Sequence, residues 1–129
     1  MSYHISTTVR GKSFEETIAL VTAALKTESF GVLTDIDIKA TLKEKLGEEF
    51  RNYRILGACN PPYAFEALKA EYKIGTLLPC NVIVDEKSAG IIEVSAVDPM
   101  ASMQAVENEA LNSIAKEIKT KLQRVVEQL

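Results

Sequence analysis

The chain has 129 residues, of which 47% are hydrophobic and 26% charged, and its formal net charge is −3. This length suits one compact domain over residues 1–129, which buries about two-thirds of its unfolded surface without a metal or disulfide. No basic stripe indicates a nucleic-acid partner, and no apolar run reaches the ~18 residues of a membrane helix. The N-terminus lacks the pattern of a signal peptide, so we expect a cytoplasmic protein with neither nucleic-acid nor membrane partners.

Hydrophobic periodicity predicts the elements in the order β-α-β-α-β-α-β-β-α. Alternating apolar and polar residues or β-branched runs mark the strands, and apolar residues three or four apart mark the helices. In chain order the pattern predicts strand 3–9, helix 14–29, strand 32–36, helix 38–46, strand 51–57, helix 61–72, strand 77–85, strand 91–97 and helical structure within 100–129.

Capping residues mark the helix boundaries. Ser13 and Glu16 have the spacing of a capping box, in which each side chain accepts a hydrogen bond from the other residue's backbone amide. Asp37 is placed to cap the second helix, and the glycine after residue 46 is placed to end it. Asn60 is a candidate cap for the third helix, with Pro61 at its first position, where the missing amide costs nothing.

The last third of the chain predicts a hairpin followed by helical structure. The short loop at residues 85–90 favours antiparallel pairing of the strands on either side. Asp98 and Pro99 repeat the cap-and-proline pattern before helical structure that begins at Met100. That structure is either one helix or a short turn followed by a longer helix from Leu111. We therefore predict a two-layer α+β fold with a mixed or mostly antiparallel sheet and helices on one face.

Two cysteines lie in similar local sequences at element boundaries. Cys59 precedes Asn60 and Pro61 before the third predicted helix, and Cys80 precedes Asn81 at the fourth predicted strand. The dipole and free amides at a helix N-terminus favour a thiolate nearby. If the intervening helix brings the two strand ends together, these five residues form a candidate ligand-binding or redox site.

The two thiols also allow other interpretations. Free cysteine is often a small buried hydrophobic residue, so both side chains are expected to serve packing if they lie apart. If they are neighbours, they are candidates to hold a small molecule or soft metal ion, or for Cys59 to act as nucleophile with Cys80 as resolving thiol. No CxxC pair supports thioredoxin-like or zinc chemistry. The sequence identifies no nucleotide-binding loop, no catalytic residue and no cofactor.

Three further features are weaker candidates. His4 is the only histidine, and a Cys-His site would require the fold to bring it to Cys59. The pair at 98–99 is expected to cap a helix with Met100 and Met103 buried, although a thioether from these methionines would add a third sulfur for Cu(I). The apolar stripe from Leu111 either packs on the chain's own sheet or forms a homodimer interface.

Several motifs follow one another in a distinctive order. They are Phe14 with the helix after it, Gly31-Val32, Cys59-Asn60-Pro61, the Leu-Leu-Pro-Cys-Asn-Val segment at 77–82, and Asp98-Pro99. In this order they resemble the prokaryotic domain-of-unknown-function family 302 over nearly the whole chain. The resemblance implies a compact α+β domain that forms dimers, implies no established activity, and favours a shared site at both cysteines.

We therefore predict a small-ligand or soft-metal binding module with its site around Cys59 and Cys80. One alternative is a thiol redox or sulfur-handling enzyme with Cys59 as nucleophile. The other is a structural or regulatory homodimer without a small-molecule site.

Overall fold

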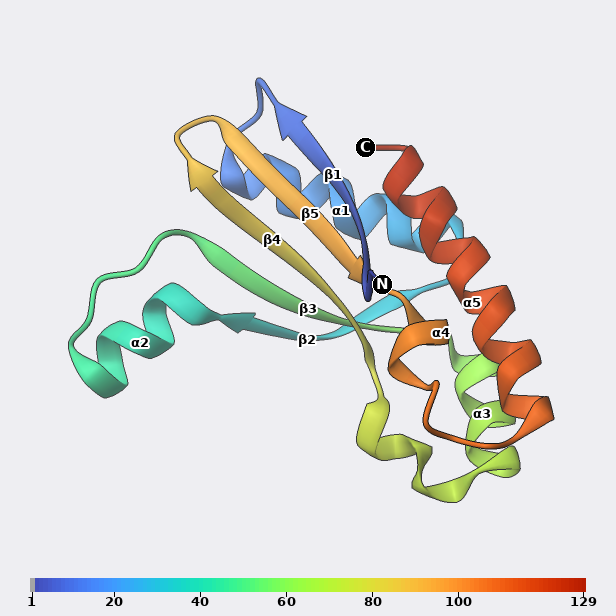
Figure 1. The fold of residues 1–129 in the computed structure, drawn as a ribbon. Helices are drawn as coiled ribbons and strands as arrows, with labels where there is room; N and C mark the ends of the chain where they lie inside the picture. The colour runs from blue at the N-terminus through green and yellow to red at the C-terminus, as the bar shows by residue number, and fades with distance from the viewer. Residues whose placement is uncertain (1) are drawn as a thin grey trace.

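The computed structural model describes residues 2–129 and contains a five-stranded sheet (Figure 1). Neighbouring strands follow the order β1-β5-β4-β3-β2, and each neighbouring pair is antiparallel. The strands are β1 (His4–Arg10), β2 (Gly31–Asp37), β3 (Tyr53–Cys59), β4 (Cys80–Ser88) and β5 (Ile91–Val97). The predicted α+β class is confirmed, and this sheet is antiparallel throughout.

The helices are distributed unevenly around the sheet. They are α1 (Phe14–Thr27), α2 (Ile38–Leu46), α3 (Pro61–Ala70), the 3-10 helix η1 (Tyr72–Leu77), α4 (Pro99–Ser102) and α5 (Glu109–Glu127). Helices α1 and α5 cover one face of the sheet, and α3 and α4 pack against α5 near one end of it (Figure 1). Helix α2 lies at the far end of β2 and β3 with no buried residue.

The predicted caps of the first two helices are confirmed. The Ser13 hydroxyl accepts a hydrogen bond from the Glu16 amide at 3.0 Å, and the Ser13 amide donates to the Glu16 carboxylate at 3.0 Å. The Asp37 carboxylate accepts from the Ala40 amide at 2.9 Å. Gly47 ends α2 with φ of +67°, a left-handed conformation that favours glycine.

Two predicted boundaries around the cysteines were wrong. The third strand continues through Cys59, two residues past its predicted end, whereas β4 begins at Cys80 and not at residue 77. The β3–β4 ladder pairs Ala58 with Cys80 and then stops, because β3 leads into α3 directly after Cys59. Leu77 and Leu78 therefore have no strand partner, and Leu77 is the last residue of η1 instead.

The C-terminal third contains two separate helices. Helix α4 ends at Ser102, and α5 starts six residues beyond the buried Met103, at Glu109. The side chain of Asn108 accepts a hydrogen bond from the Leu111 amide at 3.2 Å and so caps α5. Of the two predicted alternatives, the short turn followed by a longer helix is therefore confirmed, the turn being the four residues of α4.

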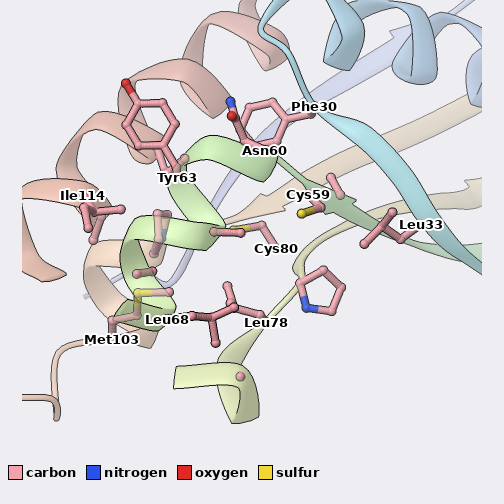
Figure 2. Close-up of a pocket in the computed structure, with 18 residues that line it drawn as sticks. Phe30, Leu33, Cys59, Asn60, Tyr63, Leu68, Leu78, Cys80, Met103 and Ile114 are labelled. Carbon is pink, nitrogen blue, oxygen red and sulfur yellow. The ribbon is translucent and has the colours of Figure 1, made fainter. Parts of the chain in front are cut away.

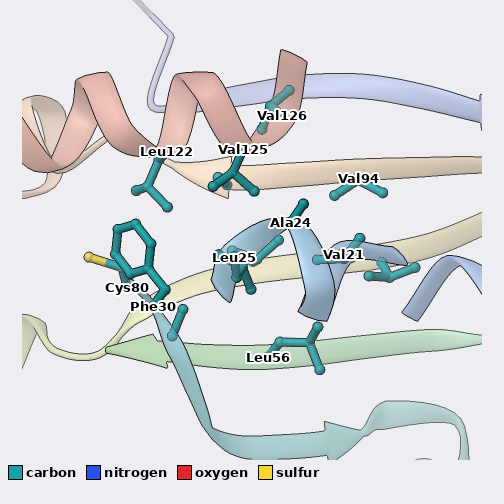
Figure 3. Close-up of a cluster of buried hydrophobic side chains, with 14 of the residues drawn as sticks. Val21, Ala24, Leu25, Phe30, Leu56, Cys80, Val94, Leu122, Val125 and Val126 are labelled. Carbon is teal, nitrogen blue, oxygen red and sulfur yellow. The ribbon is translucent and has the colours of Figure 1, made fainter. Parts of the chain in front are cut away.

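The core lies between the sheet and the helices α1 and α5 (Figure 3). Leu25 of α1, Val84 of β4, Val94 of β5 and Leu122 of α5 are fully buried within it. Burying each such side chain stabilises the fold by about 1.5–3 kcal/mol. The apolar stripe of α5 thus packs on the chain's own sheet, and the homodimer stays a prediction. None of the helices within residues 2–129 has the length and apolar character needed to cross a membrane.

Gly57 on β3 provides a test of the packing beside the cysteines. A Cβ atom at this position would overlap the Thr34 hydroxyl and lie 2.7 Å from Cγ of Pro79, whereas one at Gly31 would meet nothing within 4 Å. We expect Gly57→Ala to lower the free energy of unfolding by about 1–3 kcal/mol through overpacking. Gly31→Ala should leave it unchanged or raise it by up to about 1 kcal/mol. Urea denaturation measures both, and equal effects would contradict the packing.

Candidate functional site

A cavity with a volume of about 320 Å³ lies at the end of the sheet nearest α3 (Figure 2). The ends of β3 and β4 border it on one side, and α3, η1, α4 and α5 border it on the others. This volume is at the lower end of the range of about 300–1,000 Å³ for small-molecule sites. Its lining includes Phe30, Leu33, Tyr63, Leu68, Leu78 and Ile114. No residue of the lining, within the described part of the chain, carries a charge.

Both cysteines line this cavity as free thiols (Figure 2). Cys80 is paired with Ala58 across the β3–β4 ladder, so Cys59 lies diagonally across from it, one residue further along β3. Cys80 is buried with 8% of its surface exposed, whereas Cys59 is half-buried at the strand end. The fold therefore brings together the two residues on which the predicted site depends.

Burial controls the chemistry of the Cys80 thiol. Burial, with the neighbouring Cys59 as the smaller cause, raises the pKa of Cys80 from 9.0 to about 11. A thiolate in this position would lose its hydration without gaining a cationic partner. Cys80 is therefore a protonated thiol at neutral pH.

Asn60 occupies the cap position of α3 but does not cap it. The prediction that its side chain caps the helix was wrong. Its amide nitrogen instead donates to the Glu28 backbone oxygen at 3.1 Å, just beyond the end of α1. The residue is 5% exposed and lies in the cavity lining, where it is the most polar group. Tertiary contact with α1 has replaced the local hydrogen bond that sequence alone suggests.

The other two predicted site residues lie outside the cavity lining. Pro61 is at the first position of α3, as predicted, but it faces solvent. Asn81 follows Cys80 on β4 and therefore points to the opposite face of the sheet. There it lines a different groove together with Tyr3 and His4. The fold thus brings the two cysteines of the Cys-Asn motifs into one cavity but places their asparagines in different sites.

The weaker candidates from the sequence, His4, Asp98 and Met103, lie in different parts of the structure. His4 lines the groove on the opposite face, so it does not join Cys59 in the cavity. Asp98 caps α4 by accepting from the Met100 amide at 2.9 Å, and it also pairs with Lys119 at 2.9 Å. Met103 does line the cavity, so three sulfur-bearing side chains share it. No group of three or more His, Cys, Asp or Glu side chains within residues 2–129 is arranged to hold a metal ion.

Sequence patterns did not identify most of the apolar lining. Leu33 lies where the β2–β3 register shifts between Val32 and Thr34, and it remains 67% exposed at the edge of the cavity. A bulge re-aims a side chain, and no residue in this strand signals one. Ile114 belongs to the predicted apolar stripe of α5, but the sequence does not show which members of that stripe border a cavity.

Fold and site together define a class of protein, a two-layer antiparallel α+β domain with a thiol-bearing apolar cavity. The family described as "Domain of unknown function DUF302" matches residues 5–129, and the chain belongs to this family. A crystal structure of an uncharacterised conserved DUF302 protein from Bacillus stearothermophilus is similar to this chain, with a TM-score of 0.90 and 29% identity. The similarity covers 99% of this chain and 98% of that chain. No curated protein matches the chain.

The raised pKa of Cys80 predicts a specific alkylation profile. The rate of iodoacetamide modification at Cys80 should rise with pH about a midpoint near 11 in the folded protein, and near 9.0 in urea. Peptide-resolved mass spectrometry separates Cys80 from Cys59. An ordinary midpoint at Cys80 in the folded protein would contradict the buried, protonated thiol.

The same shift affects stability in alkaline solution. The unfolded chain releases the Cys80 proton at lower pH than the folded chain, so this contribution to stability is complete below pH 9 and is lost as pH rises to about 11. Cys80→Ala should therefore lose less stability than the wild type between these pH values. Denaturation curves at pH 8.5 and 11 measure this difference, since the other titrating groups are the same in both proteins.

Proposed function

We propose that the protein binds a small, uncharged and largely apolar molecule in the cavity at Cys59 and Cys80. The observation that carries this proposal is the composition of the cavity wall. Apolar side chains surround about 320 Å³, and none of the described residues that line the cavity is charged. Such a wall gives no compensation for the hydration that a charged ligand would lose on entry. An apolar ligand gains about 25 cal/mol for each Å² removed from water. The free thiols fit the reducing cytoplasm that we expect for this protein.

The protonation state of Cys80 supports a neutral ligand. Because the pKa of Cys80 is about 11, its thiol is neutral and contributes a polarizable, weakly polar group to the cavity wall. The same burial counts against Cys80 as a resolving thiol in a redox enzyme, because thiolate is the reactive form. Cys80 then contributes shape and polarizability to the wall in place of nucleophilic chemistry.

Asn60 supplies a point of orientation in this wall. Its amide nitrogen is held by the Glu28 backbone oxygen, so the side chain has a fixed position. Its side-chain oxygen forms no hydrogen bond within residues 2–129, and we propose it as the acceptor for a ligand hydroxyl or N–H group. A few fixed polar atoms in an apolar pocket are the usual source of orientation and specificity.

The size of the cavity limits both the ligand and its affinity. At ~30 Å³ per water molecule, 320 Å³ corresponds to roughly eleven water volumes, the scale of a two-ring hydrocarbon. A ligand of about ten non-hydrogen atoms at about −0.5 kcal/mol per atom would gain about −5 kcal/mol. We therefore expect dissociation constants between about 1 mM and 1 μM.

Naphthalene is a suitable neutral probe for this cavity. We expect its titration into ¹⁵N-labelled protein to shift the amide signals of Cys59, Ala67 and Met103, which lie along the lining. Ala64→Leu should weaken binding at least tenfold, because the half-buried Ala64 lines the cavity and the larger side chain would fill part of it. Ala110→Leu is the matched control, an exposed alanine of α5 outside the lining.

A second readout uses the reactivity of Cys59. Bound naphthalene should slow the alkylation of Cys59, which shares the cavity, in the wild type but not in a correctly folded Ala64→Leu variant. Unchanged spectra with naphthalene and with smaller neutral probes such as toluene would reject the proposal. Equal weakening by Ala64→Leu and Ala110→Leu would place the binding elsewhere.

A second candidate is a Cu(I) site, which one observation favours. Cys59, Cys80 and Met103 line the same cavity, and thiolate and thioether sulfurs are the ligands that Cu(I) prefers. A copper ion would have to displace the Cys80 proton, so its affinity should rise with pH. The raised pKa of this thiol makes the neutral apolar ligand the better-supported proposal.

Competition with a Cu(I) chelator tests this candidate. Tight 1:1 binding that Cys80→Ser abolishes and Met103→Leu weakens would favour copper over the apolar ligand. Met100→Leu is the matched control, because Met100 is 38% exposed and is not part of the lining. Equal effects of the two methionine substitutions would reject a three-sulfur site.

A further inference from the structure

A second concave site lies on the face of the sheet that α1 and α5 leave uncovered. This groove has a volume of about 260 Å³. Six of the residues that line it are Tyr3, His4, Asn81, Ile83, Glu93 and Ser95. In contrast to the cavity at the cysteines, it combines apolar surface with a carboxylate, an imidazole, an amide and a hydroxyl.

The strand register places these side chains in rows across β1, β5 and β4. Ser95 of β5 stands between Ser6 of β1 and Ile83 of β4. One row along, Glu93 stands between Thr8 and Asp85. The groove therefore follows β5, with Ser95 on its floor and Glu93 towards one end.

Hydrogen bonds fix the polar groups on the β1 side of the groove. The Ser95 and Ser6 hydroxyls are 2.7 Å apart, and the Ser6 hydroxyl is 2.7 Å from Nδ1 of His4. Ser95 is only 8% exposed although it lies on the uncovered face. The rings of Tyr3 and His4 meet in a T-shaped arrangement, with centroids 5.0 Å apart and planes at 84°. The rings of Tyr3 and His4 thus form a positioned wall.

At the Glu93 end of the groove, the negative charges are only partly compensated. Glu93 is directly opposite Asp85, and like charges in such a cross-strand pair are destabilising. Asp85 is compensated by Arg51, whose Nε and Nη2 lie 2.6 Å and 3.1 Å from its two carboxylate oxygens. Glu93 forms no ion pair with any residue between 2 and 129. Within the described part of the chain, the carboxylate of Glu93 therefore faces the groove without an ion-pair partner.

We propose that this groove binds a small organic ammonium ion with an apolar body. The ammonium group pairs with Glu93, and the apolar body lies along Ile83 in the direction of the Tyr3 ring. At ~30 Å³ per water molecule, 260 Å³ is roughly nine water volumes, which suits a ligand of about that many non-hydrogen atoms. A divalent metal fits poorly, because Glu93 is the single carboxylate among the described residues of the lining.

Benzylammonium and its neutral analogue benzyl alcohol test the proposal on the full chain. In ¹⁵N-resolved NMR titrations, benzylammonium should shift the amides of Asn81, Glu93 and Ser95, and benzyl alcohol should bind there at least tenfold more weakly. Glu93→Gln should weaken benzylammonium binding at least tenfold. It should also raise the melting temperature, because the like-charge pair with Asp85 is removed. Glu107→Gln changes the net charge equally at an exposed loop site and should do neither.

Three results would overturn the proposal. They are equal affinities for the two probes at the groove, unchanged benzylammonium binding by folded Glu93→Gln, and groove signals that shift with protein concentration alone, which would place a second copy of the chain there. None of these results bears on naphthalene binding at the cysteine cavity, so each proposal can be rejected without the other.

Discussion

Within residues 2–129, helices cover one face of the sheet and leave the other open. Because side chains alternate along each strand, neighbouring residues lie in two different environments. Cys80 points into the cavity at the helices, and the next residue, Asn81, points to the open face. For each polar or sulfur-bearing side chain of β4 and β5, the face to which it points decides which of the two environments it enters. An apolar cavity and a polar groove therefore lie on opposite sides of the same strands.

The cavity exists because the strands and helices separate at one end of the sheet. The β3–β4 ladder stops at the pair Ala58–Cys80. Beyond this pair, β3 continues into α3, and η1 leads into β4. Helix α5 closes the far side, with Ile114 and Ile118 in the lining. This packing buries Cys80 away from any cation and thereby raises the pKa of its thiol. The same packing that makes the cavity apolar thus limits its thiol chemistry.

Local patterns predicted those elements that rely on local interactions. The capping box at Ser13 and Glu16 and the left-handed glycine at 47 involve residues within a few positions of one another, and both are present as expected. The start of β4 was missed because a strand requires a partner, and Leu77 has an apolar sequence without one. The Asn60 side chain was assigned to a local cap, but the end of α1, about thirty residues earlier in the chain, supplies its partner.

The sequence by itself determined the α+β class, the order of the elements and the two thiols as the residues to examine, because periodicity and capping act over short distances. Its ordered motifs also indicated the family, and the match over residues 5–129 confirms that family. Only the tertiary structure decided that Cys59 and Cys80 share a wall, that Asn81 belongs to another groove with His4, and that Leu33 borders the cavity. Those relations depend on strand register, a bulge and burial, which arise from contacts between distant segments.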